Sequence, residues 1–139
     1  MKMKLWVSTT NSRHEIDGVA YCTTVEGNTR KQLFVNALRA YLAYCNDESV
    51  KRAVKAKAIR SFSKWEFMLS NSKNPGKQYG ETEYWILKKN NDWVIREYNR
   101  NWRGSIHDTI FTAIYRIPNA KVKHPFAEDF MVKATNKDD

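Results

Sequence analysis

The segment Asn28–Cys45 constrains the fold of this 139-residue chain most, because it is the longest uninterrupted stretch of helical periodicity. Thr29 precedes Gln32 by three residues, the spacing of a capping box, in which a hydroxyl and an amide satisfy backbone donors left open at a helix start. Apolar residues follow at helical spacing: Leu33, Phe34, Ala37, Leu38, Tyr41, Leu42 and Cys45. A polar stripe lies on the other side: Gln32, Asn36 and Arg39. The pattern predicts a helix over residues 29–45 whose apolar side packs on neighbouring strands.

Strand-forming and turn-forming residues alternate on both sides of this helix. Residues 4–8 and 19–25 are expected to form antiparallel strands, with a turn signal at Asp17-Gly18 between them. The segment 93–98 is a strand under every interpretation of its neighbours. Isoleucines at helical spacing predict a further helix over residues 105–116, which Pro118 ends.

Two segments fit more than one structure. Residues 59–69 show both strand alternation and helical spacing, and we favour a strand for part of them. Residues 81–89 form either a hairpin with residues 93–100, turning at Asn90-Asn91-Asp92, or a short helix. The remaining expected elements are a short helix from 46 to about 57, a loop over 71–80 and a last short helix over 125–131.

These elements predict one small domain of the α/β or α+β class over residues 1–134, followed by a disordered tail, 135–139. We expect a sheet of about four to five mixed strands, packed by the helices 29–45 and 105–116. The chain is 13% aromatic, and large aromatic side chains can supply much of the core of such a domain.

Nothing in the sequence predicts export, a membrane span or a metal site. The first residues lack the apolar core of a signal peptide, and no apolar run is long enough to cross a bilayer. Cys22 and Cys45 have apolar neighbours and no metal-binding spacing, which favours buried thiols in a reducing compartment; a disulfide between them is the alternative. The three histidines have no zinc spacing. We therefore expect a cytoplasmic protein with no membrane partner, no metal and no cofactor.

The net charge is +9, from 24 basic and 15 acidic residues, which favours an anionic partner. Residues 51–64, called the basic run below, hold six cations and no acid. The candidate ligand-binding residues in the basic run are Lys51, Arg52, Lys55 and Arg60. Such a run is either a solvated helix face or an electrostatic contact surface for phosphates.

A second basic cluster follows the segment 93–98. If that segment is a strand, Arg96, Tyr98 and Arg100 share one face, where guanidinium groups suit phosphates and a ring can stack a base. The candidate residues that follow are Trp102, Arg103 and His107. They lie next to the expected helix start at Ser105, whose free N–H groups favour an anion. The alternative for Tyr98 and Trp102 is burial in the core.

Asn28–Leu38 resembles the first-helix pattern of the ribonuclease H-like family, N-x-R-x-E-L-x-x-x-A-L. The run from Trp93 to Asn99, then Gly104, then His107–Ile114, is similar to the last strand, loop and final helix of that family. The resemblance implies a site in which several carboxylates hold two magnesium ions. Gln32 stands at the position of the family's helix glutamate, so the resemblance implies a catalytically degenerate copy that binds but does not cleave.

The sequence therefore predicts a non-catalytic basic module that binds nucleic acid or a phosphorylated nucleotide. The alternative is a small inhibitor or adaptor, of the kind found among phage or mobile-element accessory proteins, that docks on an acidic surface of a partner protein. Assembly into a homo-oligomer is open under both.

Overall fold

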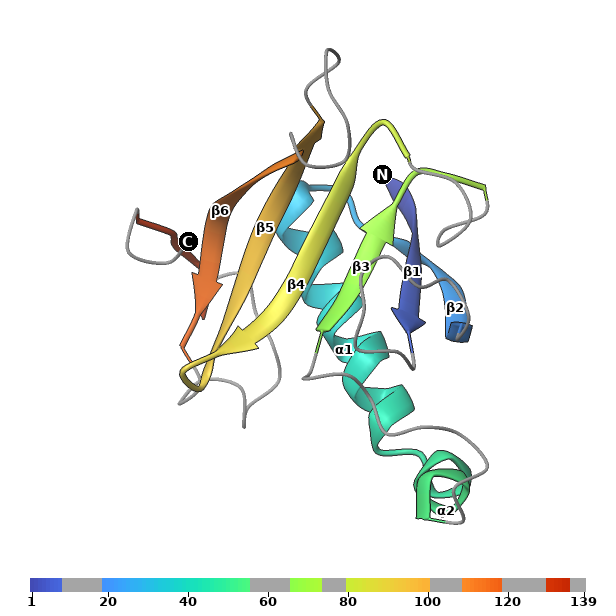
Figure 1. Ribbon diagram of the computed structural model, residues 1–139. Helices are drawn as coiled ribbons and strands as arrows, with labels where there is room; N and C mark the ends of the chain where they lie inside the picture. The colour runs from blue at the N-terminus through green and yellow to red at the C-terminus, as the bar shows by residue number, and fades with distance from the viewer. Residues whose placement is uncertain (9–18, 56–65, 74–79, 101–108, 119–129, 136–139) are drawn as a thin grey trace.

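The computed structural model describes residues 1–8, 19–55, 66–73, 80–100, 109–118 and 130–135 (Figure 1). The elements in chain order are β1 (Lys2–Ser8), β2 (Val19–Glu26), α1 (Arg30–Cys45), α2 (Glu48–Lys55), β3 (Glu66–Ser70), β4 (Glu83–Lys89), β5 (Asp92–Arg100), β6 (Thr109–Ile117) and β7 (Val132–Lys133). The expected strands 4–8 and 19–25 are confirmed as the antiparallel pair β1 and β2. The short helix expected from residue 46 is confirmed as α2, while residues 56–57 lie outside the described ranges.

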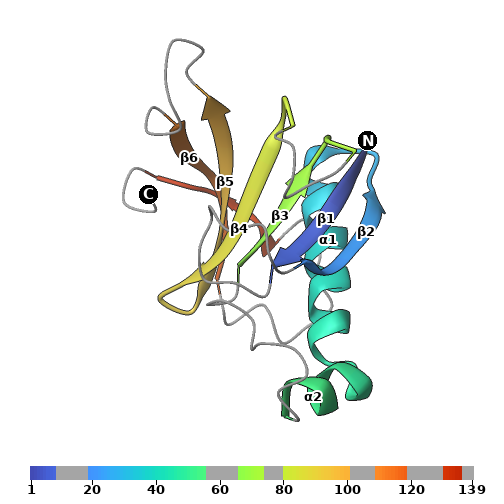
Figure 2. The same ribbon diagram turned by 45° about the vertical axis from the view of Figure 1, so that its right-hand side comes forward.

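The seven strands form one sheet in the order β2-β1-β3-β4-β5-β6-β7. Every pairing between described neighbours is antiparallel. α1 runs along one face of this sheet, as Figures 1 and 2 show from two directions. The α+β class is confirmed, but the expectation of about four to five mixed strands is wrong. The sheet is larger because segments expected to be helical, or left between helix and strand, joined it as β3, β4 and β6.

α1 begins with the capping interactions that its sequence predicts. Thr29 Oγ1 accepts a hydrogen bond from the Gln32 N–H at 3.1 Å, and Gln32 Oε1 accepts one from the Asn28 N–H at 2.8 Å. The glutamine thus bonds the residue before the cap rather than the cap itself. Both contacts satisfy backbone donors that lack partners within the helix. Gln32, which the resemblance places at a catalytic position, has this structural role here.

The apolar side of α1 forms the main core with the facing side of the sheet. Its buried residues are Leu33, Phe34, Val35, Ala37, Leu38 and Tyr41. The Tyr41 ring stacks on Phe67 of β3 with centroids 4.4 Å apart, and its edge meets Trp93 of β5 at 5.8 Å. Offset-stacked and edge-to-face aromatic pairs add stability beyond the area that they bury. Aromatic contacts therefore join helix and sheet within a core that is otherwise mainly aliphatic.

The helix expected over residues 105–116 is wrong, because Thr109–Ile117 is strand β6, and residues 105–108 lie outside the described ranges. β6 pairs with β5, and the register shifts so that Ile95 faces Tyr115 while Arg96 faces Ala113. This shift leaves Ile114 as an extra residue in β6. An extra residue breaks the two-residue alternation of a strand, which explains why the isoleucines mimic helical spacing.

The hairpin interpretation of residues 81–100 is confirmed. β4 pairs with β5 from Glu83 opposite Tyr98 to Lys89 opposite Asp92. The two connecting residues, Asn90 and Asn91, have positive φ angles of 50° and 68°. Asparagine tolerates this region better than other non-glycine residues, and the twist of such a turn matches that of the strands.

Other expectations reach into parts of the chain that the structure does not describe. Part of 59–69 is strand as favoured, namely β3, whereas residues 59–65 are outside the described ranges. The same holds for residues 125–129 of the expected last helix, after which β7 is a two-residue strand. Of the expected tail 135–139, only Thr135 is described, so its disorder stays a prediction.

We expect Leu38→Ala to lower the free energy of unfolding by about 2–5 kcal/mol, because Leu38 is fully buried between helix and sheet. The matched control is Ala43→Gln on the exposed side of α1, with an expected change under about 0.5 kcal/mol. Asn36→Ala is unsuitable as a control, because Asn36 Nδ2 donates to the Glu26 carbonyl at 2.8 Å. Urea unfolding measures both variants, and equal losses would contradict the assignment of the helix sides.

Candidate functional site

Arg96 and Tyr98 lie on the sheet face opposite α1, called the second face below. Residues directly opposite one another in antiparallel strands project to the same side. Arg96 is opposite Trp85 of β4, and Tyr98 is opposite Glu83 of the same strand. The expectation that Arg96 and Tyr98 share one face is therefore confirmed. Arg100 ends β5, and its side chain is outside the described part of the structure.

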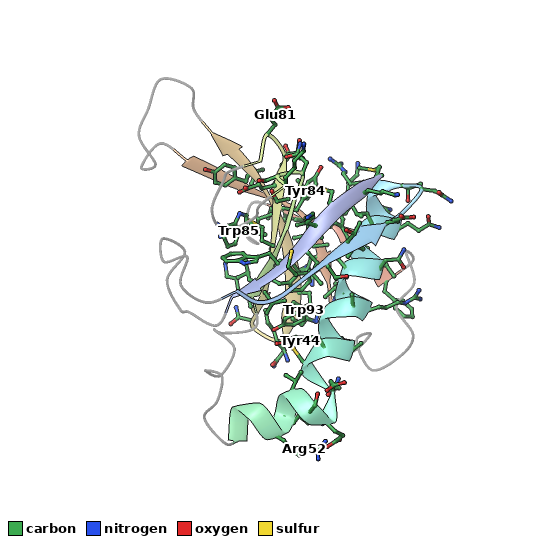
Figure 3. All side chains as sticks on the ribbon, turned by 90° about the vertical axis from the view of Figure 1, so that its right-hand side faces the viewer. Tyr44, Arg52, Glu81, Tyr84, Trp85 and Trp93 are labelled. Atoms are coloured by element: carbon green, nitrogen blue, oxygen red, sulfur yellow. The ribbon has the colours of Figure 1, made fainter. Side chains whose placement is uncertain are left out.

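The second face carries its own small core of four large side chains: Trp6, Met68, Trp85 and Tyr98. Three of them form a continuous row across the sheet, since Trp6 of β1 is opposite Met68 of β3, which is opposite Trp85 of β4. Figure 3 labels Trp85 beside the strands. Tyr98 is only 7% exposed and Trp85 only 8%. Burial in the core, the alternative stated for Tyr98, is therefore confirmed, and a ligand contact for its ring is untested.

A buried carboxylate stands at one end of the second face. Glu83 is 1% exposed, and its Oε2 accepts a hydrogen bond from the Gly80 N–H at 2.9 Å. A carboxylate removed from water is stable only when donors surround it. A Cβ at Gly80 would lie 2.6 Å from Ser70 Oγ and would also overlap Asn71 Oδ1, so a larger residue would displace these two side chains. Sequence reasoning missed Glu83, because a glutamate beside a polar loop gives no signal of burial.

A second group that sequence reasoning missed surrounds Tyr115 of β6, where the start of α1 meets the sheet. The Arg30 guanidinium lies 5.7 Å from the centre of the Tyr115 ring, and Lys31 Nζ lies 5.5 Å from it. Arg30 also pairs with Glu97 of β5 at 3.5 Å. A hydrogen bond to Tyr115 is the main cause that raises the pKa of Arg30. These contacts hold both cations against the protein.

α2 presents the first part of the basic run. Lys51 and Arg52 are exposed, and Arg52 Nε donates to the Glu48 carbonyl one turn earlier at 3.4 Å. Figures 1 and 2 show α2 beyond the end of α1 and away from the strands. Figure 3 labels Arg52 at the far end of the molecule from Glu81. Lys55 ends α2 with its side chain outside the described part, and Arg60 lies wholly outside it.

Asp47 caps α2. Its Oδ1 accepts hydrogen bonds from the N–H groups of Ser49 at 2.9 Å and Val50 at 3.2 Å, and from the Ser49 hydroxyl. The hydroxyl bond, followed by the Val50 N–H, lowers the pKa of Asp47. An ionised cap at the positive end of a short helix stabilises that helix. Asp47 therefore stabilises the start of α2 through local hydrogen bonds.

The other candidates of the second basic cluster, Trp102, Arg103 and His107, lie outside the described ranges. The anion site expected beside them depended on a helix starting at Ser105. Residues 109–117 form β6 instead, and Ser105 lies outside the described ranges, so an anion site at Ser105 stays a prediction.

The expectation that Cys22 is a buried thiol is wrong, because Cys22 is exposed. Its strand, β2, lies at the margin of the sheet, and its side chain projects beside Trp6 on the second face. Cys45 is half-buried, and burial raises the pKa of its thiol. Neither cysteine is in a disulfide.

Within the ranges that the structure describes, no three His, Cys, Asp or Glu residues gather as metal ligands would. Neither described helix has the length and apolar character needed to cross a bilayer. No protein-family model, curated protein or solved structure compared with this chain matches it. Membership of the ribonuclease H-like family stays a prediction, although the final helix that the resemblance implies for His107–Ile114 is replaced from Thr109 onward by β6.

We expect Tyr98→Ala to destabilise the fold by about 3–5 kcal/mol, because it removes a buried ring from the small core of the second face. Tyr98→Phe keeps the ring and should lose less. Chemical unfolding measures both. A Tyr98→Ala variant of unchanged stability would show that the ring is not part of a packed core.

The cap of α2 should depend on pH. The pKa of Asp47 is lowered in the folded state, so its contribution is complete above the unfolded pKa and is lost as the pH falls through the folded value. We expect the Ser49 and Val50 amide resonances to shift with the titration of Asp47 in acid. Asp47→Asn keeps a capping oxygen and should abolish this titration, whereas Asp47→Ala should lower the helicity of α2 at every pH. Identical pH profiles for Asp47→Asn and the parent protein would contradict the assignment.

Proposed function

We propose that the protein binds nucleic acid through its phosphates, with α2 as the main contact element. The observation that carries this proposal is a contrast in solvent exposure between the basic run and the second basic cluster. Lys51 and Arg52 are exposed on a helix that stands off the body of the protein. Tyr98, which the stacking hypothesis needs, is buried. Phosphates on the outside of a nucleic acid can reach Lys51 and Arg52 without any change in the sheet.

The arrangement of opposite charges supports the same surface. Three cations of the sheet and of the start of α1 are paired with acids: Lys2 with Glu26 at 3.2 Å, Arg30 with Glu97 at 3.5 Å, and Arg116 with Asp92 at 3.0 Å. The acids at α2, Asp47 and Glu48, both precede the basic run, which contains none through residue 64. Three cations outside α2 thus have an acid beside them, whereas six cations follow one another without an acid in the basic run.

The residue types indicate the mode of binding. Exposed lysine and arginine side chains are long and hydrated, so they neutralise phosphates without requiring a fixed geometry. Contacts of this kind position a protein on nucleic acid but read no base. We therefore expect binding that depends weakly on sequence and strongly on salt.

A salt titration tests this proposal. We expect the double variant Lys51→Ala, Arg52→Ala to weaken binding to a fluorescent DNA duplex, and to reduce the slope of log K against log salt by about 0.9 for each lost phosphate contact. The control, Lys2→Ala with Lys133→Ala, removes the same charge from exposed positions on the sheet. Fluorescence anisotropy over a range of salt measures all three proteins.

Equal loss in the two double variants would mean that only net charge matters, and α2 would then not be the contact element. The variant Arg96→Ala tests the second basic cluster, to which Arg96 belongs. The sequence hypothesis predicts weaker binding at all salt concentrations for this variant, whereas contact through α2 predicts that its affinity equals that of the parent protein at every salt concentration. If the parent protein binds neither duplex, single strand nor nucleotide, the nucleic-acid proposal is wrong and docking on an acidic protein surface becomes the better hypothesis.

A further inference from the structure

The backbone pattern of β2 shows which of its groups point out of the sheet. Met1 and Gly27 exchange two hydrogen bonds, of 2.8 and 3.0 Å, between their backbone groups, so they form a hydrogen-bonded pair. In an antiparallel ladder such pairs alternate with pairs whose N–H and C=O groups point away from each other. The register is regular from the pair Lys2 and Glu26 to the pair Val7 and Tyr21. The backbone groups of Cys22, Thr24 and Glu26 therefore point away from β1.

The stretch of outward-pointing backbone groups is shortened at both of its ends. The Glu26 carbonyl already accepts a hydrogen bond from Asn36 of α1, which agrees with its outward direction. At the other end, the register shifts between Val7 and Ser8, which distorts the strand beyond Tyr21. The stretch that remains regular and open therefore runs from Cys22 to Thr24, and no described residue pairs with it. It has two N–H groups and two carbonyl groups directed away from β1.

The two margins of the sheet differ in how they are protected. β7, at one margin, has only two residues and contains Lys133. Short strands and lysines are features that keep edges from pairing with other chains. β2, at the other margin, has eight residues, and Val19–Val25 carries no charge. Figure 1 shows β2 at the right-hand side of the sheet, beyond β1.

We propose that β2 pairs with β2 of a second copy of this chain, in antiparallel orientation about a two-fold axis at Thr23. This register is self-complementary, because Cys22 of each copy faces Thr24 of the other. The four open groups of each copy then form four hydrogen bonds across the axis. A second copy fits better than a charged strand, since the open stretch is uncharged and its two outward residues are partners for each other.

Both copies carry a charge of +9, so they repel each other at long range. Salt screens this repulsion. Self-association should therefore strengthen as salt rises, the opposite of the salt dependence expected for nucleic-acid binding. The two proposals are independent, and the sign of the salt effect separates them.

Sedimentation of the free protein tests the pairing. Thr24→Pro removes an outward N–H, at a position where an edge strand tolerates proline, and with it two of the four hydrogen bonds. We expect the dimer dissociation constant to rise roughly tenfold or more for this variant. Thr24→Val keeps the backbone donor and the branched side chain, so it should dimerise like the parent protein.

Disulfide trapping tests the register. In a Cys45→Ser background, Thr24→Cys places a thiol opposite Cys22 of the second copy, with Cα atoms about 5.5 Å apart. Diamide should then accept two protons and two electrons from each thiol pair and yield a covalent dimer. Cys22 alone should trap poorly, because the two Cys22 residues are diagonal neighbours roughly 7–8 Å apart, at the limit for a disulfide.

A protein that remains monomeric at all concentrations and salt levels would overturn the proposal. So would a dimer that Thr24→Pro leaves unchanged, because its interface would lie elsewhere. If Thr24→Pro lowers the melting temperature sharply, its loss of dimer can result from unfolding. The disulfide-trapping experiment with Thr24→Cys then decides. Absence of a cross-linked dimer with the thiol at position 24 would then contradict the pairing.

Discussion

The packing of α1 on one face of an antiparallel sheet is the contact on which the rest of the structure depends. Tyr41 lies between Phe67 and Trp93, so a single helical residue ties β3 and β5 together. At the other end of the helix, Phe34 meets Tyr84 edge to face at 4.8 Å. These ring contacts connect α1 to three neighbouring strands, β3, β4 and β5.

The second face of the sheet, opposite α1, has a core of its own. Trp6, Met68, Trp85 and Tyr98 supply a smaller core there, and the buried Glu83 is held by a backbone donor at its margin. The ring of Tyr98, which the sequence offers as a stacking surface, is part of this core. The functional hypothesis therefore moves from the sheet to α2, where the cations remain in contact with solvent.

The two proposed surfaces lie on different elements and respond to salt in opposite directions. α2 carries exposed charge, and Asp47 caps its first turn. The open stretch of β2 carries no charge and offers only backbone groups. Electrostatic contact weakens as ions screen it, whereas pairing between two like-charged copies becomes easier. A single protein can thus use a charged helix for an anionic ligand and a neutral edge for its own copy.

The sequence by itself determined the elements whose signals are local. The cap at Thr29 and the periodicity of α1 depend on neighbouring residues, and the structure confirms both, whereas the Asn90-Asn91 hairpin was one of two alternatives that the sequence left open. Tertiary structure alone decided that residues 109–117 form a strand, because a register shift that adds Ile114 is defined only against β5. It also decided that Tyr98 and Glu83 are buried and that Cys22 is exposed. Burial depends on which strands are neighbours and which lie at the margin, and strand order is set by contacts between residues far apart in the chain.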